Sequence, residues 1–210
     1  MKEIILVGGG GHCRSIIDSI IRSNEFHIAG IVDSIGVGHE VLGIKVIGID
    51  GDLQKFYDKG YHNAFISIGS IGDPKIRVKL YKELKDIGYK IPTIIDKSAI
   101  ISESSKIEEG VFIGKGAIVN SSSIIKKNSI INSGSIIEHD CFIEEFVHIA
   151  PGVTLSGGVK VGRNSHIGTN STVIQGISIG EDSIVGAGTV IIRDVGDNIK
   201  VCGNPGREIL

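Results

Sequence analysis

Residues 107–143 read IEEGVFIGKGAIVNSSSIIKKNSIINSGSIIEHDCFI, and this stretch decides the fold. A branched aliphatic residue stands at every sixth position, and the same step continues outward from Ile95 to Ile191 without an insertion. Four positions after each aliphatic comes a small or β-branched residue, such as Ala117, Ser135 or Cys141. Because both columns keep one phase, we expect both to point into a core.

A period of six residues matches neither the turn of an α-helix nor the simple alternation of an isolated strand. It does match a short strand followed by a turn, and three such units close a triangular coil of about 18 residues. Glycine and asparagine suit the corners because they tolerate positive φ. The stretch from Ile95 to Gly196 therefore predicts about five and a half stacked coils of a β-helix, and not a β-sandwich, whose strands keep no fixed spacing.

The position just before each aliphatic is predicted to face outward, because neighbouring residues of a strand alternate sides. Several of these outward positions are apolar and are expected to form one strip, which a monomer would leave in water. The sequence therefore predicts an oligomer. The apolar outward positions between residues 112 and 142 are Phe112, Ile118, Ile124, Ile130, Ile136 and Phe142.

The first part of the chain lacks the repeat and alternates strand-like with helix-like segments, which predicts a small Rossmann-like α/β domain with a parallel sheet. We assign this domain to residues 1–91, the β-helix to 92–196 and a C-terminal tail to 197–210, with Gly88–Pro92 as the hinge region. The expected strands are Ile4–Val7, His27–Val32 and Ala64–Ile68, and the expected helices are Arg14–Ile21, Asp52–Lys59 and Lys75–Ile87.

Four consecutive glycines, Gly8 to Gly11, lie between the first strand and the first helix. Such a loop presents backbone N–H groups and the positive end of a helix to an anion, so phosphate is its natural ligand. Cys13 stands where the dinucleotide fingerprint has its third glycine, which argues against NAD. Asp33 ends the second strand and is placed to accept hydrogen bonds from a ribose. A turn without a ligand and a plain loop acid are the alternatives.

The net charge, the apolar runs and the cysteines of the chain exclude several classes of function. The 22 basic and 24 acidic residues give a net charge of −2, so we expect neither nucleic acid nor a membrane surface as a partner. The longest apolar runs are far shorter than a membrane span, and no signal-peptide pattern opens the chain, which favours a cytoplasmic location. The three scattered cysteines, Cys13, Cys141 and Cys202, argue against a disulfide framework or a cysteine-based zinc site.

Four motifs together resemble one family: GGGGHC near the start, IEHDC at 137–141, FVHIAPG at 146–152 and GNPGREI near the end. The chain resembles the sialic-acid O-acetyltransferases and nucleotide-amino-sugar N-acetyltransferases of the left-handed β-helix acyltransferase group, over essentially its whole length. The resemblance implies a homotrimer, a UDP-sugar held by the N-terminal domain and acetyl-CoA held in a groove between adjacent β-helices. It implies no metal.

The resemblance also implies roles for individual residues. His139 matches the general base and Asp140 the carboxylate that orients it, although some relatives have glutamate at that position. Residues matched to the acetyl-CoA site are His148 near the thioester, Gly157 as a backbone donor to it, and Thr169 and Ala187 along the pantetheine channel. Residues matched to the nucleotide-sugar loop are Gly10, Gly11, His12 and Asp33, with Ser34 where relatives have a second acid.

The chemistry of these residue types agrees with acetyl transfer. A base must take a proton from the attacking amine or hydroxyl, and a donor must stabilise the oxyanion that develops from the thioester. Histidine with a carboxylate on its other nitrogen suits the first task. Cys141 lies in the inward column, so we interpret it as a core residue and not as a nucleophile. Arg207 and Arg193 are candidates for binding the phosphates of CoA.

Three other functions remain open at this stage. O-acetylation of sialic acid would use the same His–Asp machinery. His148 and His166 are 18 residues apart and therefore stacked, which would suit a zinc enzyme of the γ-carbonic anhydrase type, although the close histidine pair of that family is missing. A non-catalytic nucleotide-sugar-binding scaffold is the third. N-acetylation of a nucleotide-linked amino sugar, with the amine as acceptor, is the function the sequence favours.

Overall fold

The computed structural model describes residues 1–34 and 36–209, and contacts divide the chain into two compact units. The first unit comprises Met1–Gly69 and Lys75–Lys97. The second comprises the short segment Ser70–Pro74 and the chain from Ser98 onward. Ser70–Pro74 is thus grouped with the second unit although the residues on either side of it in sequence belong to the first.

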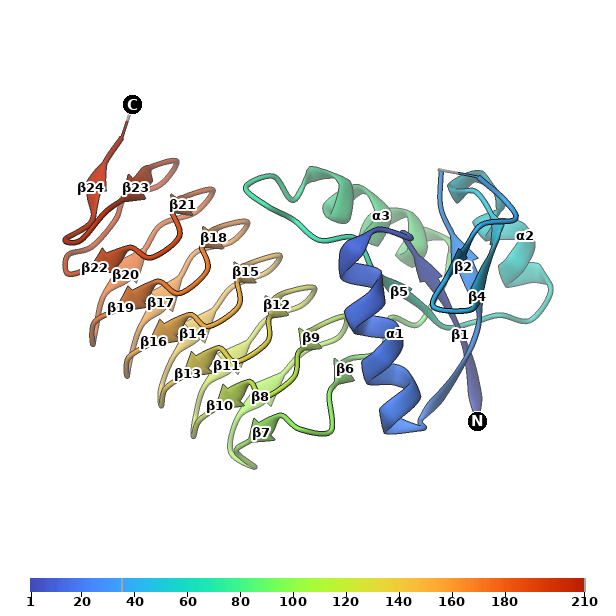
Figure 1. The fold of residues 1–210 in the computed structure, drawn as a ribbon, viewed down its shortest axis with the longest axis horizontal. Helices are drawn as coiled ribbons and strands as arrows, with labels where there is room; N and C mark the ends of the chain where they lie inside the picture. The colour runs from blue at the N-terminus through green and yellow to red at the C-terminus, as the bar shows by residue number, and fades with distance from the viewer. Residues whose placement is uncertain (35, 210) are drawn as a thin grey trace. The chain divides into compact units, whose positions relative to one another are not determined.

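The first unit is an α/β domain around one sheet of order β3-β4-β2-β1-β5 (Figure 1), parallel except at β3. Its central strand β1 has four consecutive fully buried residues, Ile4 to Val7, as expected for a parallel strand covered on both faces. The elements are β1 (Lys2–Val7), α1 (Gly11–Ser23), β2 (Phe26–Val32), β3 (Glu40–Val41), β4 (Ile44–Gly48), the 3-10 turn η1 (Asp50–Asp52), α2 (Leu53–Asp58), β5 (Ala64–Ile66), α3 (Lys75–Ile87) and β6 (Ile94–Ile95).

The helices follow from their sequences. The buried face of α1 is formed by Cys13, Ile16, Ile17 and Ile20, and the helix ends at Asn24 in the left-handed conformation. Helix α3 has the predicted bounds, and Gly88 closes it with a φ of 107°, a conformation that glycine adopts without strain.

Two details of this unit differ from the sequence-based expectation. The antiparallel hairpin of β3 and β4 was not predicted, because its strands are short and only partly buried, and they alternate weakly. Strand β5 ends at Ile66 rather than Ile68, where the buried guanidinium of Arg77 donates to the carbonyls of both residues instead of a neighbouring strand.

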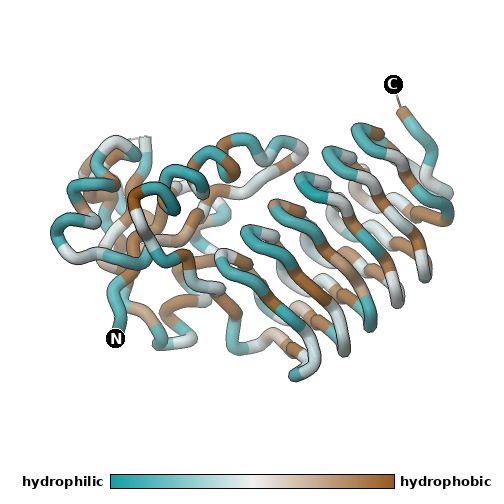
Figure 2. Tube along the Cα trace, turned by 180° about the vertical axis from the view of Figure 1, so that it is seen from behind, coloured by the Kyte–Doolittle hydropathy of each residue, from teal (hydrophilic) through white to brown (hydrophobic). Residues whose placement is uncertain are grey.

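The second unit is the predicted β-helix, a stack of coils (Figures 1 and 2). Its strands, two residues long from β7 to β22, repeat every six residues. Strands 18 residues apart pair in parallel and in register, for example Ile118 with Ile136 and His148 with His166. Three parallel sheets result, and we call them the first, second and third faces in the order in which each coil crosses them.

The first face is β7 (Ile100–Ile101), β10 (Ile118–Val119), β13 (Ile136–Ile137), β16 (Thr154–Leu155), β19 (Thr172–Val173) and β22 (Val190–Ile191). The second face is β8 (Lys106–Ile107), β11 (Ile124–Ile125), β14 (Phe142–Ile143), β17 (Lys160–Val161) and β20 (Ser178–Ile179). The third face holds β9 (Phe112–Ile113), β12 (Ile130–Ile131), β15 (His148–Ile149), β18 (His166–Ile167), β21 (Ile184–Val185), β23 (Lys200–Cys202) and the antiparallel β24 (Arg207–Glu208).

Both predicted inward columns form the core of this unit. The aliphatic column is closed to solvent from Ile113 to Ile191, and the small-residue column between them is buried as well, except at Ile177, which is partly buried. Serines of that column donate to carbonyls across the coil, as Ser129 does to Glu144 at 2.7 Å, so their hydroxyls are satisfied inside. Cys141 is likewise a core residue, and burial raises the pKa of its thiol to about 11.

The expectation of one exposed apolar strip was partly wrong. The outward positions fall on three different faces in turn, because one coil contains three strands. On the third face Phe112 and Ile130 are buried within the chain itself, whereas Ile118, Ile136 and Phe142 are half-buried on the other faces.

Candidate active site

His139 and Asp140 occupy the corner between the first and second faces, in the turn that joins β13 to β14. Asp140 has a φ of 60°, and its N–H donates to the carbonyl of Ser121 one coil below at 3.0 Å, so the corner is fixed by backbone bonds. The Nδ1 atom of His139 lies 2.8 Å from Oδ2 of Asp140. Because a carboxylate only accepts, Nδ1 carries the proton and Nε2 has a free lone pair for a substrate.

Gly157 lies one coil above His139 at the same corner. A Cβ atom on this residue would come within 2.5 Å of both Cε1 and Nε2 of the imidazole, so only glycine leaves room for the ring. Gly157 is buried, and within residues 1–34 and 36–209 its N–H has no protein acceptor. A buried N–H without a partner is costly, which suits a group that donates to a ligand.

His148 lies on a different side of the coil from His139. It stands on the third face, is 6% exposed, and its Nδ1 lies 2.6 Å from the carbonyl of Ser70. Its Nε2 lies 3.3 Å from Nδ2 of Asn132, whose Oδ1 accepts from the Ser133 N–H. The carbonyl requires a donor and the amide nitrogen requires an acceptor, so His148 is held as the neutral Nδ1–H tautomer.

His166 lies beside His148 on the next coil, as the 18-residue spacing predicts, and the two rings pack edge to face with centroids 4.9 Å apart. Burial lowers the pKa of His166, and the nearby Ser70 carbonyl opposes that shift. No group of three or more His, Cys, Asp or Glu side chains within the described ranges is arranged to hold a metal ion. The zinc interpretation is therefore supported only by the two neighbouring imidazoles of His148 and His166.

Thr169 and Ala187 share a third location, the corner between the third and first faces. Both are exposed, and they are linked through the intervening turn, where the Gly188 N–H donates to the Thr169 carbonyl at 2.8 Å. The structure thus brings His139, Asp140 and Gly157 together. In a single chain it places His148, Thr169 and Ala187 on other sides of the coil.

The glycine loop forms the N-terminus of α1 in the first unit. Gly10 is the N-cap, Gly11 is the first helical residue and His12 follows it, so the positive end of the helix lies at this loop, where it suits an anion. The Cys13 N–H already donates to the Gly10 carbonyl at 3.1 Å. Asp33 is largely buried, and its carboxylate accepts a hydrogen bond from the Gly9 N–H. Part of the role of Asp33 is therefore to hold the loop.

Two features of the candidate residues were not predicted as they stand. The contact of Asn132 and Ser70 with His148 has no regular spacing in the sequence, since Ser70 comes from a loop far along the chain. Arg193 and Arg207 line one cavity of about 250 Å³ beside the last coils, together with Ile192 and the acids Asp194 and Glu208. The sequence had suggested both arginines but not that they share a cavity.

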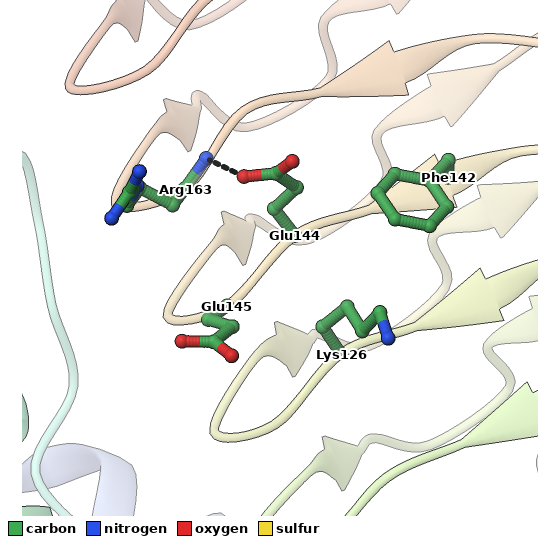
Figure 3. A pocket seen from close by; sticks show the side chains of 5 residues that line it. All are labelled: Lys126, Phe142, Glu144, Glu145 and Arg163. Atoms are coloured by element: carbon green, nitrogen blue, oxygen red, sulfur yellow. Dashed lines mark hydrogen bonds between the residues drawn. The ribbon is translucent and has the colours of Figure 1, made fainter.

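A second cavity, of about 280 Å³, lies at the edge between the second and third faces (Figure 3). Its charged groups are engaged with one another or with their neighbours. Lys126 pairs with Glu108 at 2.7 Å, and Arg163 pairs with Glu181 at 2.9 Å. The carboxylate of Glu144 accepts a hydrogen bond from the backbone N–H of Arg163 at 3.2 Å. This cavity has no histidine and no bare backbone of the kind found beside His139.

Comparison with known proteins adds family evidence to this geometry. The profile of the PglD N-terminal domain matches residues 3–84, that of the bacterial transferase hexapeptide (six repeats) matches 140–175, and that of the hexapeptide repeat of succinyl-transferase matches 158–193. No curated protein sequence matches the chain significantly. No helix among the described residues is long and apolar enough to span a membrane.

Solved structures match over the whole chain. One is a variant of perosamine N-acetyltransferase from Caulobacter crescentus in which a histidine is replaced by asparagine, in complex with CoA and GDP-perosamine. It is 35% identical to this chain with a TM-score of 0.95, and the match covers 100% of this chain and 98% of that one. The acetyltransferase domain of PglB from Neisseria gonorrhoeae, in complex with acetyl coenzyme A, is 29% identical with a TM-score of 0.93 and 99% coverage of each chain. WeeI from Acinetobacter baumannii, 24% identical with a TM-score of 0.87 and full coverage of both chains, shares the fold.

Proposed function

Since this chain belongs to the family of left-handed β-helix acetyltransferases with a PglD-type N-terminal domain, we propose that it transfers an acetyl group from acetyl-CoA to the amino group of a nucleotide-linked amino sugar. The observation that carries the proposal is the His139–Asp140 contact of 2.8 Å beneath the amide of Gly157. The nucleotide-sugar acceptor and CoA bound to the Caulobacter enzyme support the same substrate classes.

In the proposed reaction, the neutral amine of the sugar attacks the carbonyl carbon of the thioester. Nε2 of His139 takes the proton that the amine loses, and Asp140 stabilises the imidazolium that forms. The Gly157 N–H donates to the oxygen that becomes negative. The C–S bond then breaks, the new amide is released, and the CoA thiolate recovers the proton from His139. No covalent enzyme intermediate is needed.

The acceptor is proposed to bind through its nucleotide at the glycine loop, within an N-terminal domain of residues 1–91. The N–H groups at the start of α1, at Gly10, Gly11 and His12, suit a diphosphate. Asp33, which anchors the loop through Gly9, is proposed to contact the ribose of the nucleotide.

The complete site is proposed to require a homotrimer. The outward residues of the first face are β-branched and uncharged, and Ile100 among them is 65% exposed. This face separates the corner of His139 and Gly157 from the corner of Thr169 and Ala187. Cyclic packing through this face would set the first corner of one copy against the second corner of the next, and His148 would complete the site from that neighbour.

The test is to incubate the protein with acetyl-CoA and a panel of UDP-, GDP- and CMP-linked sugars that bear a free amine, with sialic acid as the hydroxyl acceptor, while following thiol release. Turnover confined to an amino sugar, lost in His139→Asn, supports the proposal. Turnover on sialic acid alone would assign O-acetylation instead. Stoichiometric zinc with no thiol release would favour the metalloenzyme, and sugar binding without any turnover would favour a scaffold.

A further inference from the structure

A positive charge is buried at the end of β5. Arg77, in the first turn of helix α3, is only 1% exposed, and burial lowers the pKa of its guanidinium to about 10, so it stays charged at neutral pH. Its Nη1 donates to the Ile66 carbonyl at 3.0 Å and also to the Ile68 carbonyl. Because β5 is an edge strand of its sheet, these bonds take the place of those from a neighbouring strand. Arg77 therefore fixes the course of the chain where β5 ends.

The charge of Arg77 serves more than the packing of the core. Transfer of a guanidinium from water into a protein interior is unfavourable, and an apolar side chain of similar volume fills a core at lower cost. An apolar side chain cannot donate to the carbonyls of Ile66 and Ile68, however. A charged donor at this place therefore indicates that the positions of these two residues matter.

The stretch that Arg77 holds lies directly against the glycine loop of the same unit. Ser67, between the two held carbonyls, donates its backbone N–H to the Val7 carbonyl at 2.8 Å and its hydroxyl to the Gly8 carbonyl at 2.6 Å. A Cβ atom on Gly8 would overlap the side chain of Ile68, so these two residues are in close contact. The end of β5 thus forms a wall against which the loop begins.

The glycine loop needs such support, because consecutive glycines populate many backbone conformations and neighbouring groups must select one. Strands β2 and β5 flank β1 on opposite sides. From the side of β2, the carboxylate of Asp33 accepts from the Gly9 N–H. On the side of β5, a Cβ atom on Gly69 would lie 3.6 Å from the Cβ of His12, so the chain there also packs against the start of α1. The loop is therefore held between Asp33 and the stretch that Arg77 fixes.

We propose that Arg77 is a positioning residue for the acceptor, which holds the glycine loop in the conformation that receives the diphosphate, an inference that rests on the proposed function. Arg77 does not touch the ligand, because its side chain is closed to solvent. It acts through the loop, which binds more tightly when it has less backbone freedom to lose. The donor side is independent of Arg77, because Ser70 belongs to the second unit and has its own contact with His148 at 2.6 Å.

The test measures the Kd of UDP, GDP and CoA by calorimetry on the wild type and on Arg77→Lys. Lysine keeps the charge, but its ammonium nitrogen ends one bond short of Nη1. The Kd of the nucleoside diphosphate that the wild type binds more tightly is expected to rise about tenfold, which corresponds to ordering about one more backbone residue on binding. The KM of the sugar nucleotide should rise equally, with kcat and the Kd of CoA unchanged.

The matched control is Tyr89→Phe. It removes another buried donor to a main-chain carbonyl of the same unit, the hydroxyl that donates to Leu53 at 2.9 Å. This variant should lower Tm and leave the Kd of the nucleotide unchanged. Hydrogen exchange without ligand reports on the loop directly. The amides of residues 8–13 should exchange faster in Arg77→Lys than in the wild type and in Tyr89→Phe.

If Arg77→Lys does not fold, Ser67→Ala decides, because it removes the bond from the same stretch to Gly8 and should raise the nucleotide Kd in the same direction. An unchanged Kd in the deciding variant would overturn the inference. So would an equal rise in the Kd of CoA, which indicates general loss of structure, or a wild type that binds neither UDP nor GDP. If no sugar is acetylated although nucleotide binding depends on Arg77, the proposed reaction fails and the positioning role stands.

Discussion

Two edges of the same β-helix share one backbone repeat but carry different kinds of side chain. At the edge between the second and third faces, successive coils alternate in charge, with Glu109, Lys127, Glu145, Arg163 and Glu181 in one column. Neighbours in it pair directly, Lys127 with Glu145 at 3.3 Å and Arg163 with Glu181 at 2.9 Å. At the edge of His139 the equivalent column carries no ion pair between coils and is reduced to glycine directly above the base.

The contrast shows which residues specify the fold and which serve chemistry. The inward aliphatic residues are of the same kind at both edges, so they explain why the coil forms but not why the two edges differ. The charged edge satisfies its side chains within the chain, whereas the edge of His139 leaves an N–H, an imidazole lone pair and bare backbone for something else. Substitutions at the two edges should therefore separate activity from stability.

Among the substitutions that test the difference between the two edges, the largest effect is expected from Gly157→Ala. The new methyl would occupy the place of the His139 ring, displace Nε2 and obstruct the amide, lowering kcat/KM by about 10²- to 10³-fold. Gly196→Ala is the matched control, since its Cβ meets only Ile199 at an ordinary 3.7 Å. Steady-state kinetics and thermal unfolding of both variants provide the comparison. Equal activity of Gly157→Ala and the wild type would refute the crowding argument.

A smaller effect, on stability, is expected from the pH response of His166. Burial lowers its pKa below the ordinary value near 6.5, so the unfolded chain binds a proton there more readily than the folded chain. Folding stability should therefore fall as the pH drops below about 6.5, by at most about 1.4 kcal/mol per pH unit from this group. Urea unfolding between pH 5 and 8 should show a shallower decline in His166→Asn. Identical slopes would remove His166 as the cause.

The smallest effect is expected at the charged edge. Arg163→Gln removes one member of an exposed ion pair, so Tm should shift by no more than a few degrees and the shift should shrink with added salt. Acetyl transfer should keep its wild-type rate, because no atom of this edge lies at the corner of His139. A loss of activity without loss of structure would show that the two edges are not independent.

Much of the fold could be predicted from the sequence because the β-helix is a repeat in one dimension. Each inward residue, such as Ile137 or Ile143, occupies an equivalent place in its strand, so one six-residue period predicts every strand of the β-helix. The hairpin at β3 and β4 escaped prediction because β3 is an edge strand of only two residues and β4, with five, has only two buried positions. The apolar outward positions were assigned to one strip because the six-residue step was not divided among three faces.

The site was only partly predictable. His139 and Gly157 differ by one full coil, so spacing alone sets them together, and the same arithmetic stacks His148 on His166. The Ser70 carbonyl and the Asn132 amide that fix the tautomer of His148 could not be foreseen, because their contact depends on how a distant loop packs against the third face. The spacing also did not predict that Arg193 and Arg207 line the same cavity.

The central claim is that the imidazole at the corner of the first and second faces removes the proton from the attacking amine. The most direct test compares kcat/KM of the wild type and His139→Asn on the best amino-sugar acceptor, with CoA affinity and Tm measured on both proteins. The account predicts a loss of about 10²- to 10⁴-fold with affinity and Tm unchanged. A folded His139→Asn variant that acetylates at the wild-type rate would contradict it.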